Sequence, residues 1–266
     1  MSKNKKIFFQ ILLVFGVLGF LGILTNNLII NLTRTGIGFN FNWLTKPASF
    51  SLAEHPLPYS PSDSYAWALF MGWMNSLKVI ISSLVLASCI GTLIGFLRVS
   101  KNSFFRIITA GYITVIRQTP LLIQLMCWYF VGFLSIRNNS FLNLSNVVNI
   151  SNKGIELFGL NLSSEFSALL FGLSIFSSAF IAEVIRGGIQ SVPVGQWEAF
   201  RSLGISEKQG FIKIIIPQAL PAFIPGLTSQ YLNLAKNSTL AIAIGYADIY
   251  AINDTIINQT GRAVEC

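Results

Sequence analysis

Hydrophobic residues in this chain are gathered into five long stretches that polar segments separate. Each stretch reaches or exceeds the roughly 20 residues that an α-helix needs to cross a bilayer. The stretches are residues 7–30, 69–97, 112–134, 166–185 and 220–246. This pattern predicts an all-α, polytopic membrane helix bundle. The first stretch is too long for the apolar part of a signal peptide, and no small-x-small cleavage site follows it, so we expect it to be a retained span.

Composition and charge placement support this interpretation and orient the chain. Hydrophobic residues make up 53% of the sequence and charged residues 11%, whereas soluble proteins have about 25% charged residues. The net charge of +8 therefore points to cytoplasmic loops rather than to nucleic acid. If the lysines at positions 3, 5 and 6 are cytoplasmic, alternation puts the basic links 98–106 and 186–217 there as well, and the links 31–68 and 135–165 outside. We expect a cytoplasmic N-terminus.

Residues for catalysis or for cofactor binding are scarce. The sequence contains no G-x-x-x-x-G-K-[ST] motif for ATP phosphates, no H-E-x-x-H motif and no G-x-S-x-G motif. His55 is the only histidine, and the three cysteines have no metal-ligand spacing. We therefore expect no enzyme activity, no metal and no cofactor in this chain.

The last apolar stretch carries a polar stripe. On a helical wheel, five residues fall within about one third of the circumference: Ser229, Gln230, Asn233, Lys236 and Asn237. Polar groups in a membrane span are costly unless they face protein or water. The stripe therefore favours the wall of a translocation path, although hydrogen bonding between helices is the alternative.

Three further features mark the ends and the packing of the spans. Pro217, Pro221 and Pro225 predict a break or kink at the start of the last span, or simply a boundary between loop and helix. The GTLIG pattern of residues 91–95 permits close helix packing. Charges near span ends have a coupling or gating role or lie at the lipid interface; these are Arg117, Glu183 and Arg186, the last two on one helix face.

A short amphipathic helix is predicted at residues 194–204 in the last basic link. Trp197, Phe200 and Leu203 form its apolar face, and Glu198 lies on another side. Gly204 is a typical helix C-terminal glycine. We expect the aromatic residues to be exposed and to dock into a groove of a partner protein or to lie in the lipid interface; the spacing alone does not choose between the two.

This segment resembles the EAA loop of the permeases of ABC importers. The pattern EAA, three residues, G, nine residues, I, one residue, LP matches Glu198, Ala199, Gly204, Ile214 and Pro217, with departures at Phe200 and Ile216. The stretches RQTPLLIQL, IAEVIRGGIQSVPVGQWEA, IPQALP and NLAKNSTLAIAIGYADI look like the polar amino acid permease family. YSPSDSYAWALFMGWMNSL is similar to the first permease subunit of general L-amino-acid importers.

The resemblance implies a fold, partners and a site. It implies the ABC type-1 permease fold in a bacterial inner membrane, without catalysis in this chain. It also implies an ATPase subunit that binds ATP and Mg²⁺, a related second permease in a heterodimer, a periplasmic or lipid-anchored solute-binding protein, and an amino acid as substrate. The ATPase-coupling residues would be Trp197, Glu198, Ala199, Phe200, Gly204, Ile214 and Pro217. The gate would extend the polar stripe, giving Ser229, Gln230, Asn233, Lys236, Asn237, Ser238 and Thr239.

The resemblance also sets the expected domain organisation. Residues 1–68 would hold one span and a periplasmic segment, and residues 69–266 the type-1 transmembrane domain. The family has a further span after GYADI, so we expect this domain to be incomplete at its C-terminus, in a fragment or a truncated permease. The alternative function is a secondary transporter or channel for a small polar solute that works without an ATPase.

Overall fold

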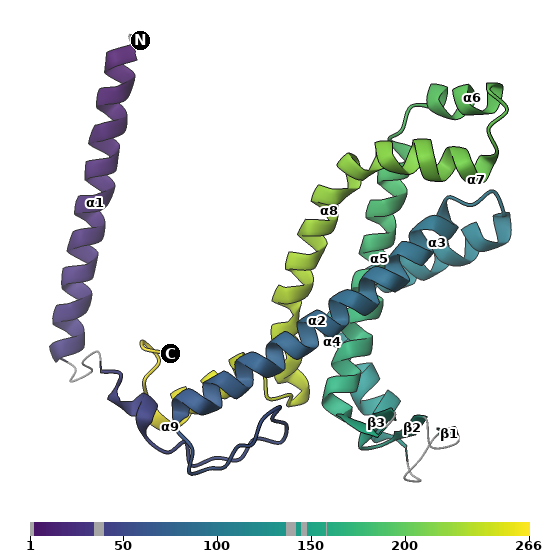
Figure 1. Ribbon diagram of the computed structural model, residues 1–266. Helices are drawn as coiled ribbons and strands as arrows, with labels where there is room; N and C mark the ends of the chain where they lie inside the picture. Colours follow the sequence, from purple (N-terminus) through teal and green to yellow (C-terminus); the bar gives the residue numbers. More distant parts are fainter. Residues whose placement is uncertain (1–2, 35–39, 137–141, 145–147, 158) are drawn as a thin grey trace.

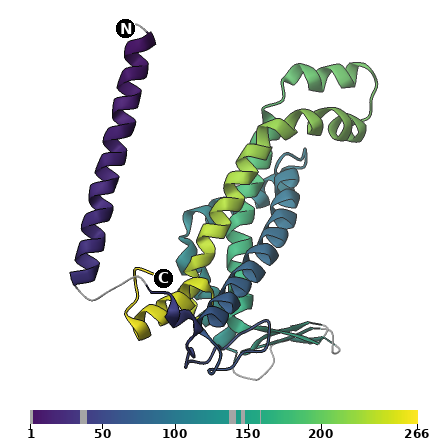
Figure 2. The same cartoon turned by 60° about the vertical axis from the view of Figure 1, so that its left-hand side comes forward.

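The computed structural model describes residues 3–34, 40–136, 142–144, 148–157 and 159–266. Within this part, four helices are long and apolar enough to cross a membrane, and a shorter apolar helix covers Leu121–Leu134. The first is α1 (Lys3–Arg34), which stands apart from the other helices in both ribbon views (Figures 1 and 2). Its apolar side chains are exposed around the whole circumference, as expected for a helix whose surroundings are lipid or a partner protein.

The predicted spans 69–97, 166–185 and 220–246 correspond to single long helical segments. They are α2 (Tyr65–Arg98), α5 (Ser164–Gln190), and α8 (Ile216–Asn237) with its 3-10 extension η4 (Ser238–Ile244). The α-helix continues through Pro221 and Pro225, so of the predicted break or kink only a kink is possible there. The ribbon nevertheless bends where the preceding segment enters α8 (Figure 1), in the region that contains the prolines.

The third predicted span is interrupted. Residues 103–134 form α3 (Ser103–Gln118), α4 (Leu121–Met126) and the π-helix η2 (Cys127–Leu134). Pro120 cannot donate a backbone hydrogen bond, and Thr119 before it has an extended backbone. The carbonyls left free by this break are satisfied by Gln124, whose Nε2 donates to the oxygens of Ile116 and Thr119, each at 3.0 Å. An interruption at membrane depth is thereby closed by protein.

The most extensive helix contact joins α2 to α5. A Cβ atom at Gly91 would lie 2.7 Å from Cβ of Ile181, and one at Gly95 would lie 3.0 Å from Cβ of Ile185. Both glycines therefore allow the two backbones to approach closely, which confirms the close packing predicted from GTLIG.

The end of the molecule opposite α6 contains a small sheet, and we call it the sheet end. Four antiparallel strands follow one another in sequence order: β1 (Leu142–Leu144), β2 (Val148–Ser151), β3 (Gly154–Leu157) and β4 (Leu160–Ser163). The segment before α2, including η1 (Asn42–Thr45), and α9 (Ile249–Thr260) also lie here. The hydrophobic pattern did not predict these strands.

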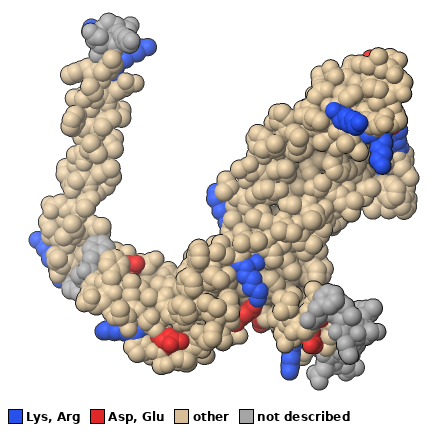
Figure 3. Space-filling view, viewed as in Figure 1, with Lys and Arg blue, Asp and Glu red and all other residues tan. Residues whose placement is uncertain are grey.

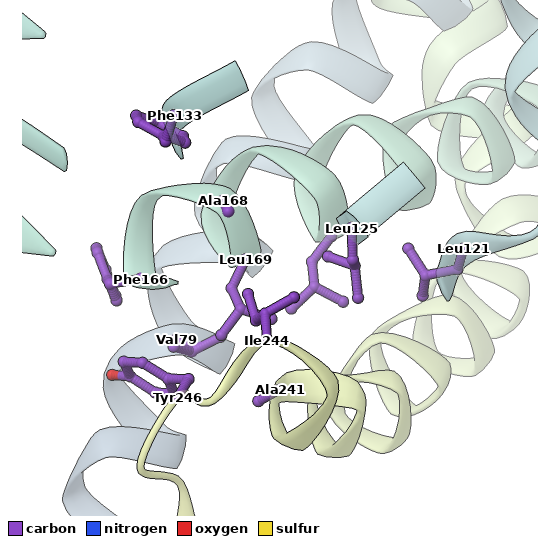
Figure 4. Close-up of a cluster of buried hydrophobic side chains, with 11 residues drawn as sticks. Val79, Leu121, Leu125, Phe133, Phe166, Ala168, Leu169, Ala241, Ile244 and Tyr246 are labelled. Atoms are coloured by element: carbon purple, nitrogen blue, oxygen red, sulfur yellow. The ribbon is translucent and has the colours of Figure 1, made fainter. Parts of the chain in front are cut away.

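A cluster of buried apolar side chains holds the sheet-end halves of the helices together. Leu125 of α4, Leu169 of α5, and Ile244 of η4 are at most 4% exposed and face one another (Figure 4). Tyr246 completes the cluster beside η4. Burying each such side chain contributes about 1.5–3 kcal/mol, so this cluster fixes the position of η4 relative to α4 and α5.

Candidate functional site

The polar stripe of α8 faces a hollow that α5 closes from the other side. Gln230, Asn233 and Asn237 line this hollow of about 310 Å³. The α5 residues on its other wall are Phe176, Ser177 and Phe180. Three amides and a hydroxyl therefore surround the space together with two aromatic rings. Such an arrangement can form hydrogen bonds to a polar solute and pack against its apolar part.

The other stripe residues have different surroundings. Ser229 and Lys236 are exposed and do not line this hollow. Ser238 is buried and donates to the carbonyl of Ala235 at 2.8 Å, whereas Thr239 is exposed. The structure thus brings together three of the seven residues predicted for the translocation path and gate. The α5 wall was missed by the sequence analysis because Phe176 and Phe180 look like ordinary core residues.

Of the three charges expected near span ends, two pair with each other and the third contacts a residue that lines the hollow. Arg186 Nε donates to both carboxylate oxygens of Glu183, at 2.9 and 3.0 Å, which confirms the pairing expected from their spacing. The guanidinium of Arg117 at the end of α3 lies over the Phe180 ring, 5.1 Å from its centre. Arg117 therefore contacts a residue of the α5 wall in a cation–π arrangement.

A hairpin of two short helices joins α5 to α8 at the opposite end from the sheet, and we call it the α6–α7 hairpin. It consists of α6 (Val194–Ser202) and α7 (Glu207–Gly210), and the π-helix η3 (Phe211–Ile215) leads from it into α8. Gly204 has a φ of +72°, and the N–H of Ile205 donates to the carbonyl of Phe200 at 3.1 Å. The predicted helix end at Gly204 is confirmed, with the long bond of a Schellman motif.

The aromatic face of α6 points into the molecule, so the expectation of exposed aromatics is wrong. Phe200 is only 1% exposed, and Trp197 is half-buried with its ring centre 6.1 Å from that of Phe211. A Cβ atom at Gly210 would lie 2.4 Å from the Phe200 ring. The chain's own α7 and η3 cover this face, because a glycine at position 210 leaves room for the phenyl ring. The remaining face exposes Glu198 and Ala199.

The sequence analysis also missed the ionic contact between Glu207 and Lys101 near this hairpin. Glu207 of α7 accepts hydrogen bonds from Arg201 of α6 and from Lys101, which lies between α2 and α3. The pair with Lys101 joins positions 106 residues apart and so leaves no local spacing signal, whereas the pair with Arg201 crosses the turn between α6 and α7.

Comparison with known proteins relates these features to a family. Residues 87–260 match the family model described as the binding-protein-dependent transport system inner membrane component. The amino-acid ABC transporter permease protein YhdX of Escherichia coli (strain K12) is 32% identical over 338 residues, which cover 97% of this chain and 86% of the relative. The chain belongs to the permease family of ABC amino acid importers.

Two further similarities agree. The general L-amino acid transport system permease protein AapQ of Rhizobium johnstonii is 30% identical, over 99% of this permease and 86% of the relative. A crystal structure of an amino acid ABC transporter with histidines has 32% identity and a TM-score of 0.60, covering 76% of this permease and 83% of that chain. The alignments with YhdX and AapQ, 338 and 344 residues long, exceed the 266 residues of this permease. Both relatives therefore contain internal segments that this permease lacks.

Membership in the family settles the general role. This permease is a multi-pass inner membrane subunit of a binding-protein-dependent ABC transporter. The ATPase of such systems is a separate subunit, so ATP is bound and hydrolysed there and the permease itself carries no cofactor. Permeases of this kind form complexes with ATPase subunits and binding proteins.

Proposed function

We propose that this permease moves polar or general L-amino acids along the α5–α8 hollow, and that ATP hydrolysis on a partner subunit drives the movement through the α6–α7 hairpin. One observation carries the proposal: Gln230, Asn233 and Asn237 share a single hollow with Ser177. An amide or a hydroxyl facing lipid is costly. Four such groups around one space supply hydrogen-bond partners for a solute that has left water.

The surface that meets the ATPase is the outer face of α6. Glu198 and Ala199 of the EAA pattern are exposed, and Leu203 is 76% exposed. Phe200 does not belong to this surface, because it packs inside the hairpin. The departure from the family pattern at position 200 therefore leaves the docking face of α6 unchanged, and Trp197 and Phe200 act by fixing how α6 lies on α7 and η3.

Charge placement supports a cytoplasmic position for the hairpin and for the N-terminus. Arg98, Lys101 and Arg106 lie at the same end as the α6–α7 hairpin, and the acidic groups visible in Figure 3 lie mostly at the sheet end. Basic residues are retained on the cytoplasmic side of membrane proteins. The sheet, α9 and the segment before α2 would then face the solute-binding protein.

The exposed intramembrane charges support a second permease as a neighbour. Lys236 is exposed on α8, and Arg117 is exposed on α3. A charge at this depth requires protein or water beside it. We place a related second permease against this side, in a heterodimer, and we assign residues 1–68 to an N-terminal span with an outer segment and residues 69–266 to the type-1 transmembrane domain.

The path is tested by Asn233→Leu in the complete transporter, reconstituted in proteoliposomes with its binding protein. We expect uptake to fall about tenfold or more while the complex still assembles, because a hydrogen-bonding group that lines the hollow is lost. Thr228→Val is the matched control on α8, since among the described residues the Thr228 hydroxyl bonds only to the carbonyl of Ile224 in its own helix. Equal uptake by Asn233→Leu and the wild type would assign the stripe to helix packing.

The coupling assignment is tested by Glu198→Lys in the same transporter. We expect the ATPase to dissociate or amino acid uptake to become uncoupled from ATP hydrolysis, because the charge on the outer face of α6 is reversed. ATPase association and ATP-driven uptake at wild-type levels would refute docking through α6. Transport by a complex that contains no ATPase would favour a secondary transporter.

A further inference from the structure

The turn between α2 and α3 is fastened to the α6–α7 hairpin by a shared carboxylate. Glu207 Oε1 accepts a hydrogen bond from Lys101 Nζ at 2.8 Å and another from Arg201 Nε at 2.9 Å. Lys101 belongs to the turn, Arg201 to α6 and Glu207 to α7. One side chain therefore ties the α2–α3 turn, which is distant in sequence, to both helices of the hairpin.

Aromatic rings form a second link between the same segments. Phe96 in the last turns of α2 lies edge-on to Phe211 of η3, with ring centres 6.0 Å apart. Phe211 in turn contacts Trp197 of α6, with ring centres 6.1 Å apart. The end of α2 is thus connected to α6 by an apolar contact below the ionic one.

Local helix chemistry does not account for the ionic contact. Ser206 caps α7, and an acid such as Glu207 in the first turn fits the helix dipole. That explains an acid at this position, but not why cations from two other segments converge on it. The charged groups are exposed, and exposed ion pairs contribute little to stability. Such a contact is better suited to fixing relative positions than to holding the fold together.

The α2–α3 turn is connected to the hollow through α3. Lys101 directly precedes α3, and the far end of α3 places Arg117 against the Phe180 ring, which lines the hollow. The hairpin is already connected by the chain to α5 on one side and to α8 on the other. A contact with the α2–α3 turn adds α3, the helix that contacts the α5 wall through Arg117.

We propose that Glu207 is a positioning residue that makes the α2–α3 turn move with the α6–α7 hairpin, so that the motion of the ATPase reaches the hollow through α3 as well as through α5 and α8. The proposal rests on the proposed coupling role of α6. Coupling through a contact is established by a double-mutant cycle rather than by proximity, and the two residues of the ionic link allow one.

The experiment uses the complete transporter in proteoliposomes, and its readout is the number of amino acid molecules transported per ATP hydrolysed. The variants are Glu207→Gln, Lys101→Gln and the double variant. We expect each single variant to lower this ratio about two- to fivefold, the range that an exposed ion pair can supply, and the double variant to be no worse than either single one. Raising the salt concentration should lower the ratio of the wild type towards that of Glu207→Gln.

Arg106→Gln on α3 is the matched control, because within the described part of the chain the Arg106 side chain donates a hydrogen bond only to the nearby Ser103 hydroxyl. A merely structural role of Glu207 would lower ATP hydrolysis and transport together and leave their ratio unchanged. An unchanged ratio in both single variants, or effects that add in the double variant, would overturn the proposal. Failure of the coupling role itself has a different signature, since Glu198→Lys would then keep full activity.

Discussion

The packing of Phe200 against Gly210 predicts a measurable compensation between the two positions. Gly210 has a φ of −59° and a ψ of −45°, which any residue adopts in a helix. Its backbone therefore does not require glycine, and only the phenyl ring does. Gly210→Ala would place a Cβ atom 2.4 Å from that ring, so either the ring or the α6 backbone must shift.

The magnitudes follow from burial and contact. Overpacking in Gly210→Ala costs about 1–3 kcal/mol, of which better helix propensity offsets about 1 kcal/mol. Phe200 is 1% exposed, so Phe200→Ala removes a buried phenyl ring at a cost of about 3–5 kcal/mol. In the double variant the new methyl group no longer meets a ring and fills part of the space. We expect the double variant to be at least about 1 kcal/mol more stable than the sum of the two single effects.

Hydrogen–deuterium exchange of α6 and α7 in the assembled transporter measures this local stability. These amides should exchange much faster in Phe200→Ala and moderately faster in Gly210→Ala than in the wild type. In the double variant, the increase in exchange rate should be smaller than the product of the increases in the two single variants. Lys208→Ala is the control, because Lys208 is exposed on α7. Strictly multiplicative factors would refute the inward packing of Phe200.

Three other predictions concern the remaining contacts. Gly91→Leu should prevent α2 from packing on α5, because even a Cβ atom would lie 2.7 Å from Ile181; wild-type thermal stability of the purified variant would contradict this. Glu54→Gln should lower stability by about 1 kcal/mol, since the Glu54 carboxylate pairs with Lys78 at the sheet end; an unchanged melting temperature would count against that pair. Burial raises the pKa of Asp248, which precedes α9, from 3.8 to about 6, so its ionisation costs stability. The α9 amides should therefore have larger protection factors at pH 5 than at pH 7, once the intrinsic pH dependence of amide exchange is divided out. Asp248→Asn should remove this difference, and a pH effect that persists in Asp248→Asn would assign it to another group.

The sequence allowed prediction where the signal was local or periodic. The spacing of Glu183 and Arg186 was sufficient for their pairing, since residues three apart share a helix face. The same periodicity grouped Trp197 with Phe200, but it could not reveal what covers them, because the cover comes from α7 and η3. The hydrophobic stretches predicted where the spans lie. The interruption at Pro120 was not predicted, because the sequence does not show that the Gln124 side chain satisfies the carbonyls that the break leaves free.

The residues of the candidate site also fall into those that the sequence could predict and those that it could not. The polar face of α8 follows from periodicity, so Gln230, Asn233 and Asn237 were candidates from the sequence. Their partners on α5 depend on how the two helices pack, and no pattern in an apolar helix distinguishes the wall of a hollow from a core. The strands at the sheet end were missed for another reason: they are short and rich in Asn and Ser, which are more typical of turns.

The closed interruption between α3 and α4 has a mechanical consequence. A helix that is broken inside a membrane usually offers a place to flex, because its free backbone groups can exchange partners. Here the two hydrogen bonds from Gln124 to Ile116 and Thr119 span the break, and Gln124 is 8% exposed, so water cannot readily take their place. Bending or straightening at Pro120 would strand these groups in a medium of low polarity. We therefore expect α3, α4 and η2 to move as one rigid unit. A displacement at the start of α3 would then rotate η2 with it.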